Sequence, residues 1–132
     1  MLFIRMMAIT VASNLIIPTT VFADTFNVTA ISGQKSRVHT YMSWQTKDCT
    51  PNKGIVKLAS KPQHGRAIPG EVDATIRHSR FRDNDPCIGK PMKGFSVEYQ
   101  SDDGYHGSDT FTIEATYGNR RPVIDLYNVT VK

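Results

Sequence analysis

The stretch FSVEYQSDDGYHGSDTFTIEA, residues 95–115, carries the clearest structural signal in the chain. Apolar side chains occupy every second position from 95 to 99 and again from 111 to 115. This period of two indicates β-strands with one buried face, whereas an amphipathic helix repeats every 3.6 residues. The intervening Asp102-Asp103-Gly104 is turn-forming sequence. The stretch therefore predicts two strands joined by a turn.

The same pattern continues on both sides of this stretch, and no segment favours a helix longer than one turn. Gly- and Pro-containing turns occur at residues 62–65, 69–70 and 118–119. Between them we expect further strands at 26–30, 37–44, 54–60, 67–68, 75–81 and 123–131. Seven or eight short strands at this spacing predict an antiparallel β-sandwich.

The N-terminus resembles a signal peptide for export. A single positive charge, Arg5, precedes the apolar stretch 6–17, and Val21-Phe22-Ala23 places small side chains at the positions that signal peptidase recognises. We expect cleavage after Ala23 and a periplasmic or secreted location. A membrane-spanning helix is the alternative, but about 20 apolar residues are needed to cross a bilayer and the stretch is too short.

Cleavage would leave residues 24–132 as one β-sandwich domain, which is a typical size for a single hydrophobic core. Arg5 is the only charged residue removed, so 15 basic and 12 acidic residues remain and the net charge is +3. This excess favours acidic partners weakly. It is far from the dense basic face of a nucleic-acid-binding protein.

Two cysteines, Cys49 and Cys87, are the only ones in the chain. In an exported protein an isolated pair predicts a disulfide, and closing this loop would stabilise the fold by roughly 4 kcal/mol. A copper site formed by Cys87, Met92 and a histidine is the alternative. We reject it because no histidine lies between Cys87 and Met92, and His39, His64 and His78 all lie upstream. No cofactor is expected.

Three motifs in the second half of the chain resemble a known family. They are Lys61-Pro62-Gln63-His64-Gly65, then Phe95-Ser96-Val97-Glu98-Tyr99, then Gly104-Tyr105-His106-Gly107-Ser108-Asp109-Thr110-Phe111. Together they are similar to the bacterial immunoglobulin-like and cadherin-like domains. The resemblance implies an immunoglobulin-like sandwich of about seven strands. Domains of that family usually occur in tandem, whereas this chain has a single copy and a long segment, residues 72–93.

The acidic residues of the predicted turns have two interpretations. Calcium is coordinated by six to eight oxygen atoms, and carboxylates are available at Asp83, Asp85, Asp102, Asp103 and Asp109. The chain lacks the spacing of an EF-hand and the additional acidic motifs of a cadherin site. We therefore favour ordinary turns, in which the Asp109 carboxylate accepts backbone N–H groups, and predict no metal.

The run Arg77-His78-Ser79-Arg80-Phe81-Arg82, followed by Lys90 and Lys93, is the remaining candidate for a binding site. It could recognise an acidic glycan, lipid headgroups or an acidic protein. Alternatively, it is an edge strand whose charges prevent unwanted pairing, and the sequence favours this second interpretation.

No catalytic motif such as G-x-S-x-G or H-E-x-x-H occurs, so we expect no enzyme activity. The leading hypothesis is a non-enzymatic module that binds a protein or glycan in the periplasm or outside the cell. A structural accessory subunit of a cell-envelope assembly is the alternative, followed by a small hydrolase or an enzyme inhibitor.

Overall fold

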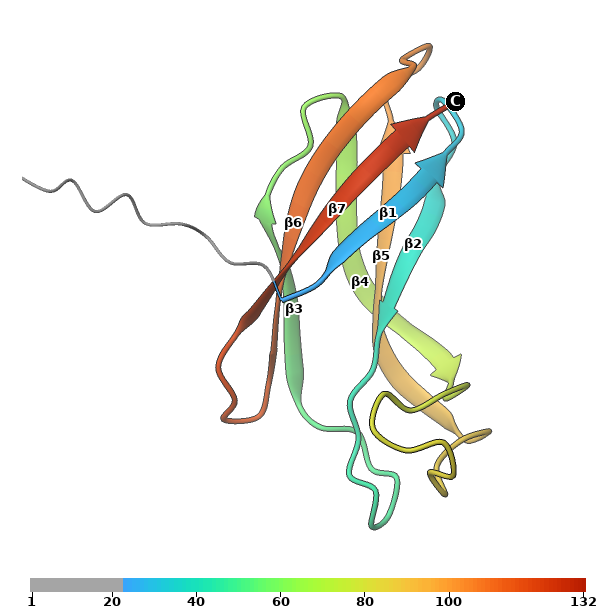
Figure 1. Ribbon diagram of the computed structural model, residues 1–132, viewed down its shortest axis with the longest axis vertical. Helices are drawn as coiled ribbons and strands as arrows, with labels where there is room; N and C mark the ends of the chain where they lie inside the picture. The colour runs from blue at the N-terminus through green and yellow to red at the C-terminus, as the bar shows by residue number, and fades with distance from the viewer. Residues whose placement is uncertain (1–22) are drawn as a thin grey trace, which may run out of the picture.

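The structure is a computed structural model that describes residues 23–132, so the predicted signal peptide falls almost entirely outside the described residues. Two β-sheets face each other in a sandwich (Figure 1), and no helix occurs between residues 23 and 132. The seven strands are β1 (Thr25–Ala30), β2 (Ser36–Tyr41), β3 (Gly54–Ser60), β4 (Gly65–Thr75), β5 (Pro91–Ser101), β6 (Gly107–Tyr117) and β7 (Val123–Val131). The prediction of an all-β sandwich of about seven strands is confirmed.

One sheet has four strands in the order β1-β7-β6-β3, and the other has three in the order β2-β5-β4. Neighbouring strands are antiparallel except for β1 and β7, which pair in parallel from Thr25 with Leu126 to Ala30 with Val131. The sequence predicted an antiparallel sandwich, and the β1–β7 pair is the one pair of named strands among residues 23–132 that departs from this arrangement. A parallel pair cannot be joined by a tight turn, and β1 and β7 avoid this constraint because they lie at opposite ends of the domain sequence.

The core lies between the sheets and is built from the alternate inward positions of the strands. Three aromatic rings cross it in nearly parallel planes: Tyr99 of β5, Phe111 of β6 and Tyr127 of β7. Their centroids are 5.9 Å and 4.8 Å apart in that order, and each side chain is at most 1% exposed. Burying side chains of this size stabilises a fold by roughly 1.5–3 kcal/mol each.

Strand β4 differs from the prediction because it runs without interruption through Pro69-Gly70, where a turn was expected between two short strands. It pairs with β5 along its whole length and is the edge of its sheet. An edge strand tolerates proline because alternate N–H groups point away from the neighbouring strand.

Residues 76–90 form a loop, so the predicted strand at 75–81 ends at Thr75. The pairing of β4 with β5 ends before Ile76. The Ile76 N–H donates a hydrogen bond to the Lys90 carbonyl, and the Ile76 carbonyl accepts one from the Gly89 N–H. Ile76 and Cys87 are fully buried in a second, smaller core together with Met92, and Met42, Trp44 and Cys49 pack against it. The loop is therefore anchored by its own apolar residues. The interpretation of residues 77–82 as a charge-protected edge strand is wrong.

Candidate binding groove

Three connecting segments, residues 42–53, 76–90 and 118–122, lie at the same end of the sandwich, the lower end in Figure 1. The predicted disulfide between Cys49 and Cys87 ties the first two together, with their Cα atoms 5.4 Å apart. Asp85 adds a second link, because its carboxylate accepts hydrogen bonds from the Trp44 indole at 3.2 Å and from the Cys87 backbone at 2.9 Å. These bonds, led by the one from Cys87, lower the pKa of Asp85.

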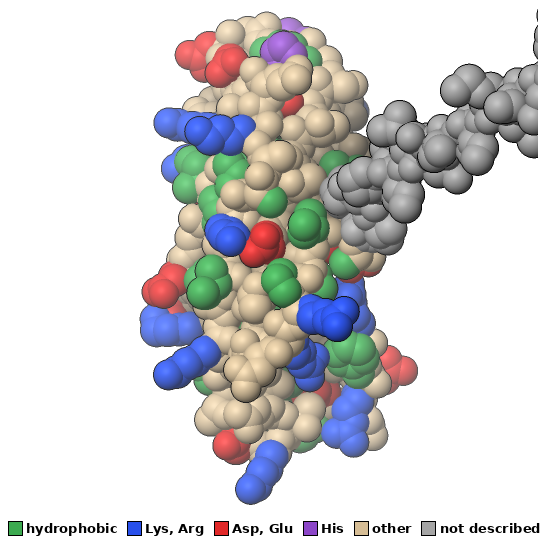
Figure 2. Space-filling view, turned by 90° about the vertical axis from the view of Figure 1, so that its left-hand side faces the viewer, with side chains coloured by type: hydrophobic (Ala, Val, Ile, Leu, Met, Phe, Trp, Pro, Cys, Tyr) green, Lys and Arg blue, Asp and Glu red, His purple; other side chains and the backbone are tan. Residues whose placement is uncertain are grey.

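A groove of about 1380 Å³ opens at this end, between strand β2 with the loop 76–90 on one side and the β6–β7 end of the other sheet. Six arginines line it: Arg37, Arg77, Arg80, Arg82, Arg120 and Arg121. We call this feature the arginine groove. On the face shown in Figure 2, most Lys and Arg side chains lie in the half of the molecule that contains this end, with hydrophobic side chains between them.

The basic side chains of the arginine groove are only partly neutralised by the protein itself, because four aspartates also line the groove: Asp24, Asp73, Asp85 and Asp125. Arg80 donates a hydrogen bond to Asp24 and forms an ion pair with it, and these interactions, led by the hydrogen bond, raise the pKa of Arg80. The other five arginines form no ion pair with any residue between 23 and 132. Like charges gathered around a concave surface create a field that attracts anions.

Aromatic side chains also line the arginine groove. They include Tyr41, Trp44, Phe81 and Tyr117. Phe81 is 82% exposed and stands between Arg80 and Arg82 in the sequence. Exposed aromatic and arginine residues together are the composition that characterises energetically important positions in protein interfaces.

A buried polar cluster forms the floor of the arginine groove. The Asp125 side chain, 4% exposed, accepts a hydrogen bond from the Tyr41 hydroxyl at 2.7 Å and from the Asp24 backbone N–H at 3.1 Å. The Tyr127 hydroxyl lies 2.7 Å from that of Tyr41. Because the Tyr41 proton points to the carboxylate, Tyr127 donates to Tyr41. Burial is the main cause that raises the pKa of Tyr41, and the hydrogen bond that its hydroxyl donates to Asp125 adds to this effect, so the hydroxyl stays protonated as a donor.

His39 and Tyr117 complete this floor. The His39 ring lies between Phe26 and Tyr41, with ring centroids 4.4 and 4.5 Å away. Burial lowers the pKa of His39, while the charge of Asp125 opposes that change. In contrast, burial raises the pKa of Tyr117 to about 12, because it disfavours the charged phenolate. The buried hydroxyl of Tyr117 has no hydrogen-bond partner in the described part of the chain.

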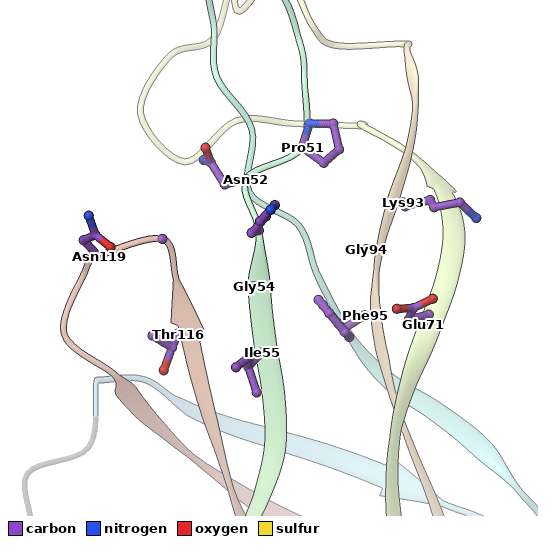
Figure 3. Close-up of a pocket in the computed structure, with 12 residues that line it drawn as sticks. Pro51, Asn52, Gly54, Ile55, Glu71, Lys93, Gly94, Phe95, Thr116 and Asn119 are labelled. Carbon is purple, nitrogen blue, oxygen red and sulfur yellow. The ribbon is translucent and has the colours of Figure 1, made fainter.

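The predicted binding residues divide into two groups. Arg77, His78, Arg80 and Arg82 all line the arginine groove. Lys93 lies elsewhere, in a smaller cavity of about 650 Å³ between β3 and β5 (Figure 3), and its ammonium is 3.0 Å from the Asp73 carboxylate. Lys90 is exposed at the end of the loop and lines neither cavity.

Sequence reasoning missed three arginines and the buried carboxylate of the groove. Arg37 lies on β2, Asp125 lies on β7, and Arg120-Arg121 follow the Gly118-Asn119 turn. The adjacent arginines after a turn were a usable signal for a basic loop. Nothing in the sequence indicated that these positions lie around the same cavity as residues 77–82.

The opposite end of the sandwich is closed by Asp109, as the sequence predicted. One carboxylate oxygen accepts the backbone N–H groups of Gln63 and Thr110, each at 2.9 Å. The other accepts the His64 N–H at 3.0 Å and the Tyr99 hydroxyl at 2.8 Å. Throughout residues 23–132, no three His, Cys, Asp or Glu side chains are grouped so that they could hold a metal ion.

No family model, curated protein or solved structure matches this chain. None of the described residues belongs to a helix long and apolar enough to cross a membrane. The disulfide is compatible with an extracytoplasmic location.

Proposed function

We propose that this protein is an exported, non-enzymatic binding module that recognises an acidic protein or glycan through the arginine groove. One observation carries the proposal. Six arginines from β2, the loop 76–90 and the β6–β7 turn line one groove, and five of them form no ion pair among residues 23–132.

The chemistry of arginine supports an anionic ligand. Its planar guanidinium donates paired hydrogen bonds that match the geometry of carboxylate, sulfate or phosphate groups. An anion in the groove would relieve the repulsion between neighbouring guanidinium groups. Each exposed pair contributes only about 0.2–1 kcal/mol, so useful affinity requires several contacts at once, which a groove lined from three segments provides.

The architecture also supports a binding role. Binding residues in sandwich proteins are commonly carried by loops that a rigid scaffold positions, and here the disulfide and the Trp44–Asp85 hydrogen bond hold two of the loops together. The predicted signal peptide and the disulfide both favour export. The resemblance to bacterial immunoglobulin-like and cadherin-like domains favours a role in recognition over one in catalysis.

Charge reversal tests this proposal. Arg77→Glu combined with Arg82→Glu should weaken binding to heparin, a sulfated glycan, or to poly-glutamate by about tenfold or more at physiological salt. Both residues are exposed and have no ion-pair partner among residues 23–132, so the fold should be unchanged.

The matched control is Lys61→Glu combined with Lys132→Glu, which changes the net charge equally at exposed positions outside the groove. This control should retain binding. An equal loss in both double variants would indicate a response to net charge alone and would contradict the proposal. The preference between heparin and poly-glutamate would separate a glycan from an acidic protein.

A further inference from the structure

Asp125 is a buried carboxylate that lacks a cation. It is 4% exposed, and no Lys, Arg or His nitrogen in the described residues lies within ion-pair distance of it. Among residues 23–132, its only hydrogen-bond donors are the Tyr41 hydroxyl and the Asp24 N–H. Buried charges are normally paired or surrounded by hydrogen-bond donors, because removing them from water is costly.

The backbone nitrogen that donates to the Asp125 carboxylate belongs to Asp24, which is the first residue after the predicted cleavage site. The backbone nitrogen of Asp24 lies 3.1 Å from Oδ1 of Asp125, and the sequence predicts cleavage between Ala23 and Asp24. Asp24 is held there independently of this bond, because its carbonyl oxygen accepts the N–H of Leu126 at 2.9 Å.

We propose that cleavage between Ala23 and Asp24 creates an α-ammonium group that forms a buried salt bridge with Asp125. In this step a signal peptidase adds water across the Ala23–Asp24 peptide bond. The Ala23 carboxylate leaves with the N-terminal segment, and the new amine of Asp24 takes up a proton. The proposal rests on the predicted cleavage site and is independent of ligand binding.

The groups around the new ammonium favour its charged form. The carboxylates of Asp125 and of Asp24 itself are negative, whereas Arg80 is positive but already paired with Asp24. Tyr41 and Tyr127 stay protonated because burial raises the pKa of each, and His39, whose pKa is lowered, is neutral at pH 7. An ammonium has three donors, so it can keep the bond to Asp125 and still contact other acceptors. The hydrogen bond from the Ala23 N–H to Ile124 is lost on cleavage.

Cleavage would also change the arginine groove, because Ala23 and Asp24 both line it. Loss of Ala23 removes one lining residue, and the new ammonium adds one positive charge to the groove. Cleavage would therefore pair the Asp125 carboxylate and change the lining of the arginine groove in a single step.

The test uses the full chain, expressed with its own N-terminus and recovered after export. Its mass should correspond to a chain that starts at Asp24. Reductive dimethylation with ¹³C-formaldehyde keeps the amine titratable and allows its pKa to be followed by NMR. In the processed protein this pKa should exceed the usual value of about 7.7–8.0 by about 1 or more.

Asp125→Asn should return the pKa of the α-amine to its usual range. Asp24→Asn is the matched control, since it removes the neighbouring carboxylate but leaves Asp125 in place, and it should retain most of the increase. If Asp125→Asn fails to fold, Tyr41→Phe offers a second measurement. It removes a donor that competes for Asp125, so the pKa of the amine should stay raised or rise further.

Two results would overturn the proposal: a mature chain that starts at another residue, or an α-amine pKa that Asp125→Asn leaves unchanged. Both are measured without a ligand. A failure of this proposal therefore stays distinct from a failure of heparin or poly-glutamate to bind the arginine groove.

Discussion

Each end of the sandwich contains a buried aspartate that accepts a tyrosine hydroxyl from the opposite sheet. At one end Asp109 of β6 binds Tyr99 of β5, and at the other Asp125 of β7 binds Tyr41 of β2. Asp109 accepts three backbone N–H groups in addition, whereas Asp125 accepts one. Both aspartate–tyrosine hydrogen bonds connect the two sheets, but the Asp109 carboxylate is surrounded by donors, whereas the Asp125 carboxylate can still accept a bond from a cation.

The segments that connect the strands also differ in length between the two ends. At the Asp109 end they are short turns, while the Asp125 end carries the long loops 42–53 and 76–90. Those loops need a disulfide and a small core of their own to hold their shape. The comparison indicates that one end is held by short turns and hydrogen bonds to a buried carboxylate, whereas the other presents a charged surface on long, cross-linked loops.

Among the variants that test this difference between the two ends, removal of the disulfide should lower the stability of the protein most. The double variant Cys49→Ala and Cys87→Ala should lower the free energy of unfolding by roughly 4 kcal/mol, because the sequence separation of 38 residues no longer constrains the unfolded chain. Urea denaturation measures the loss. Amide exchange should show the greater loss of protection in the loop 76–90 and little local change at Gln63 and His64. A loss below about 1 kcal/mol would contradict the expectation.

Asp109→Ala should rank second. It leaves three backbone N–H groups and the Tyr99 hydroxyl without their acceptor, and a hydrogen bond to a charged group contributes a net stabilisation of about 1.5–3 kcal/mol. The four contributions do not add in full, because all four bonds share one carboxylate. We expect a loss of about 3 kcal/mol in urea denaturation. The exposed variant Asp102→Ala, a few residues earlier, is the control and should cost less than about 0.5 kcal/mol.

The two tyrosines should respond unequally to removal of their hydroxyls. Tyr41→Phe removes bonds to both Asp125 and Tyr127 and should cost about 2 kcal/mol, whereas Tyr99→Phe leaves Asp109 with three backbone donors and should cost about 1 kcal/mol. Equal losses in thermal or urea unfolding would show that the two ends are supported alike.

The smallest effect should be a pH dependence that originates at the Asp125 end. Burial lowers the pKa of His39 in the folded protein, so the unfolded chain binds a proton more readily as the pH falls below about 6.5. Stability should therefore decrease with acidification through this range. His39→Phe keeps an aromatic ring between Phe26 and Tyr41 and should flatten the slope of unfolding free energy against pH. An unchanged slope would assign the dependence to other groups.

The sequence predicted the elements whose local and long-range preferences agree. The sequence segments that form β5 and β6 alternate cleanly between apolar and polar residues, and Asp109, at the start of β6, accepts backbone N–H groups as expected, so both features were predicted. The sequence also predicted a short strand at residues 75–81, yet the burial of Ile76 and Cys87 with Cys49 outweighs that local preference. The sequence predicted only the part of the arginine groove formed by residues 77–82. Arg37, Arg120 and Arg121 were missed, because strand pairings between distant residues bring them to the same groove. Parallel pairing of β1 with β7 leaves no local pattern either.

That parallel pairing has a mechanical consequence. The chain enters β1 at Thr25 and leaves β7 at Val131, and these points lie at opposite ends of the β1–β7 pair (Figure 1). A force that pulls these two points apart along the long axis slides β1 and β7 past each other, so it loads all the register pairs from Thr25–Leu126 to Ala30–Val131 together. An antiparallel hairpin pulled from its open end would separate one pair at a time. Resistance to forced unfolding depends on the unfolding rate, and the shear arrangement of this pair slows that rate under tension.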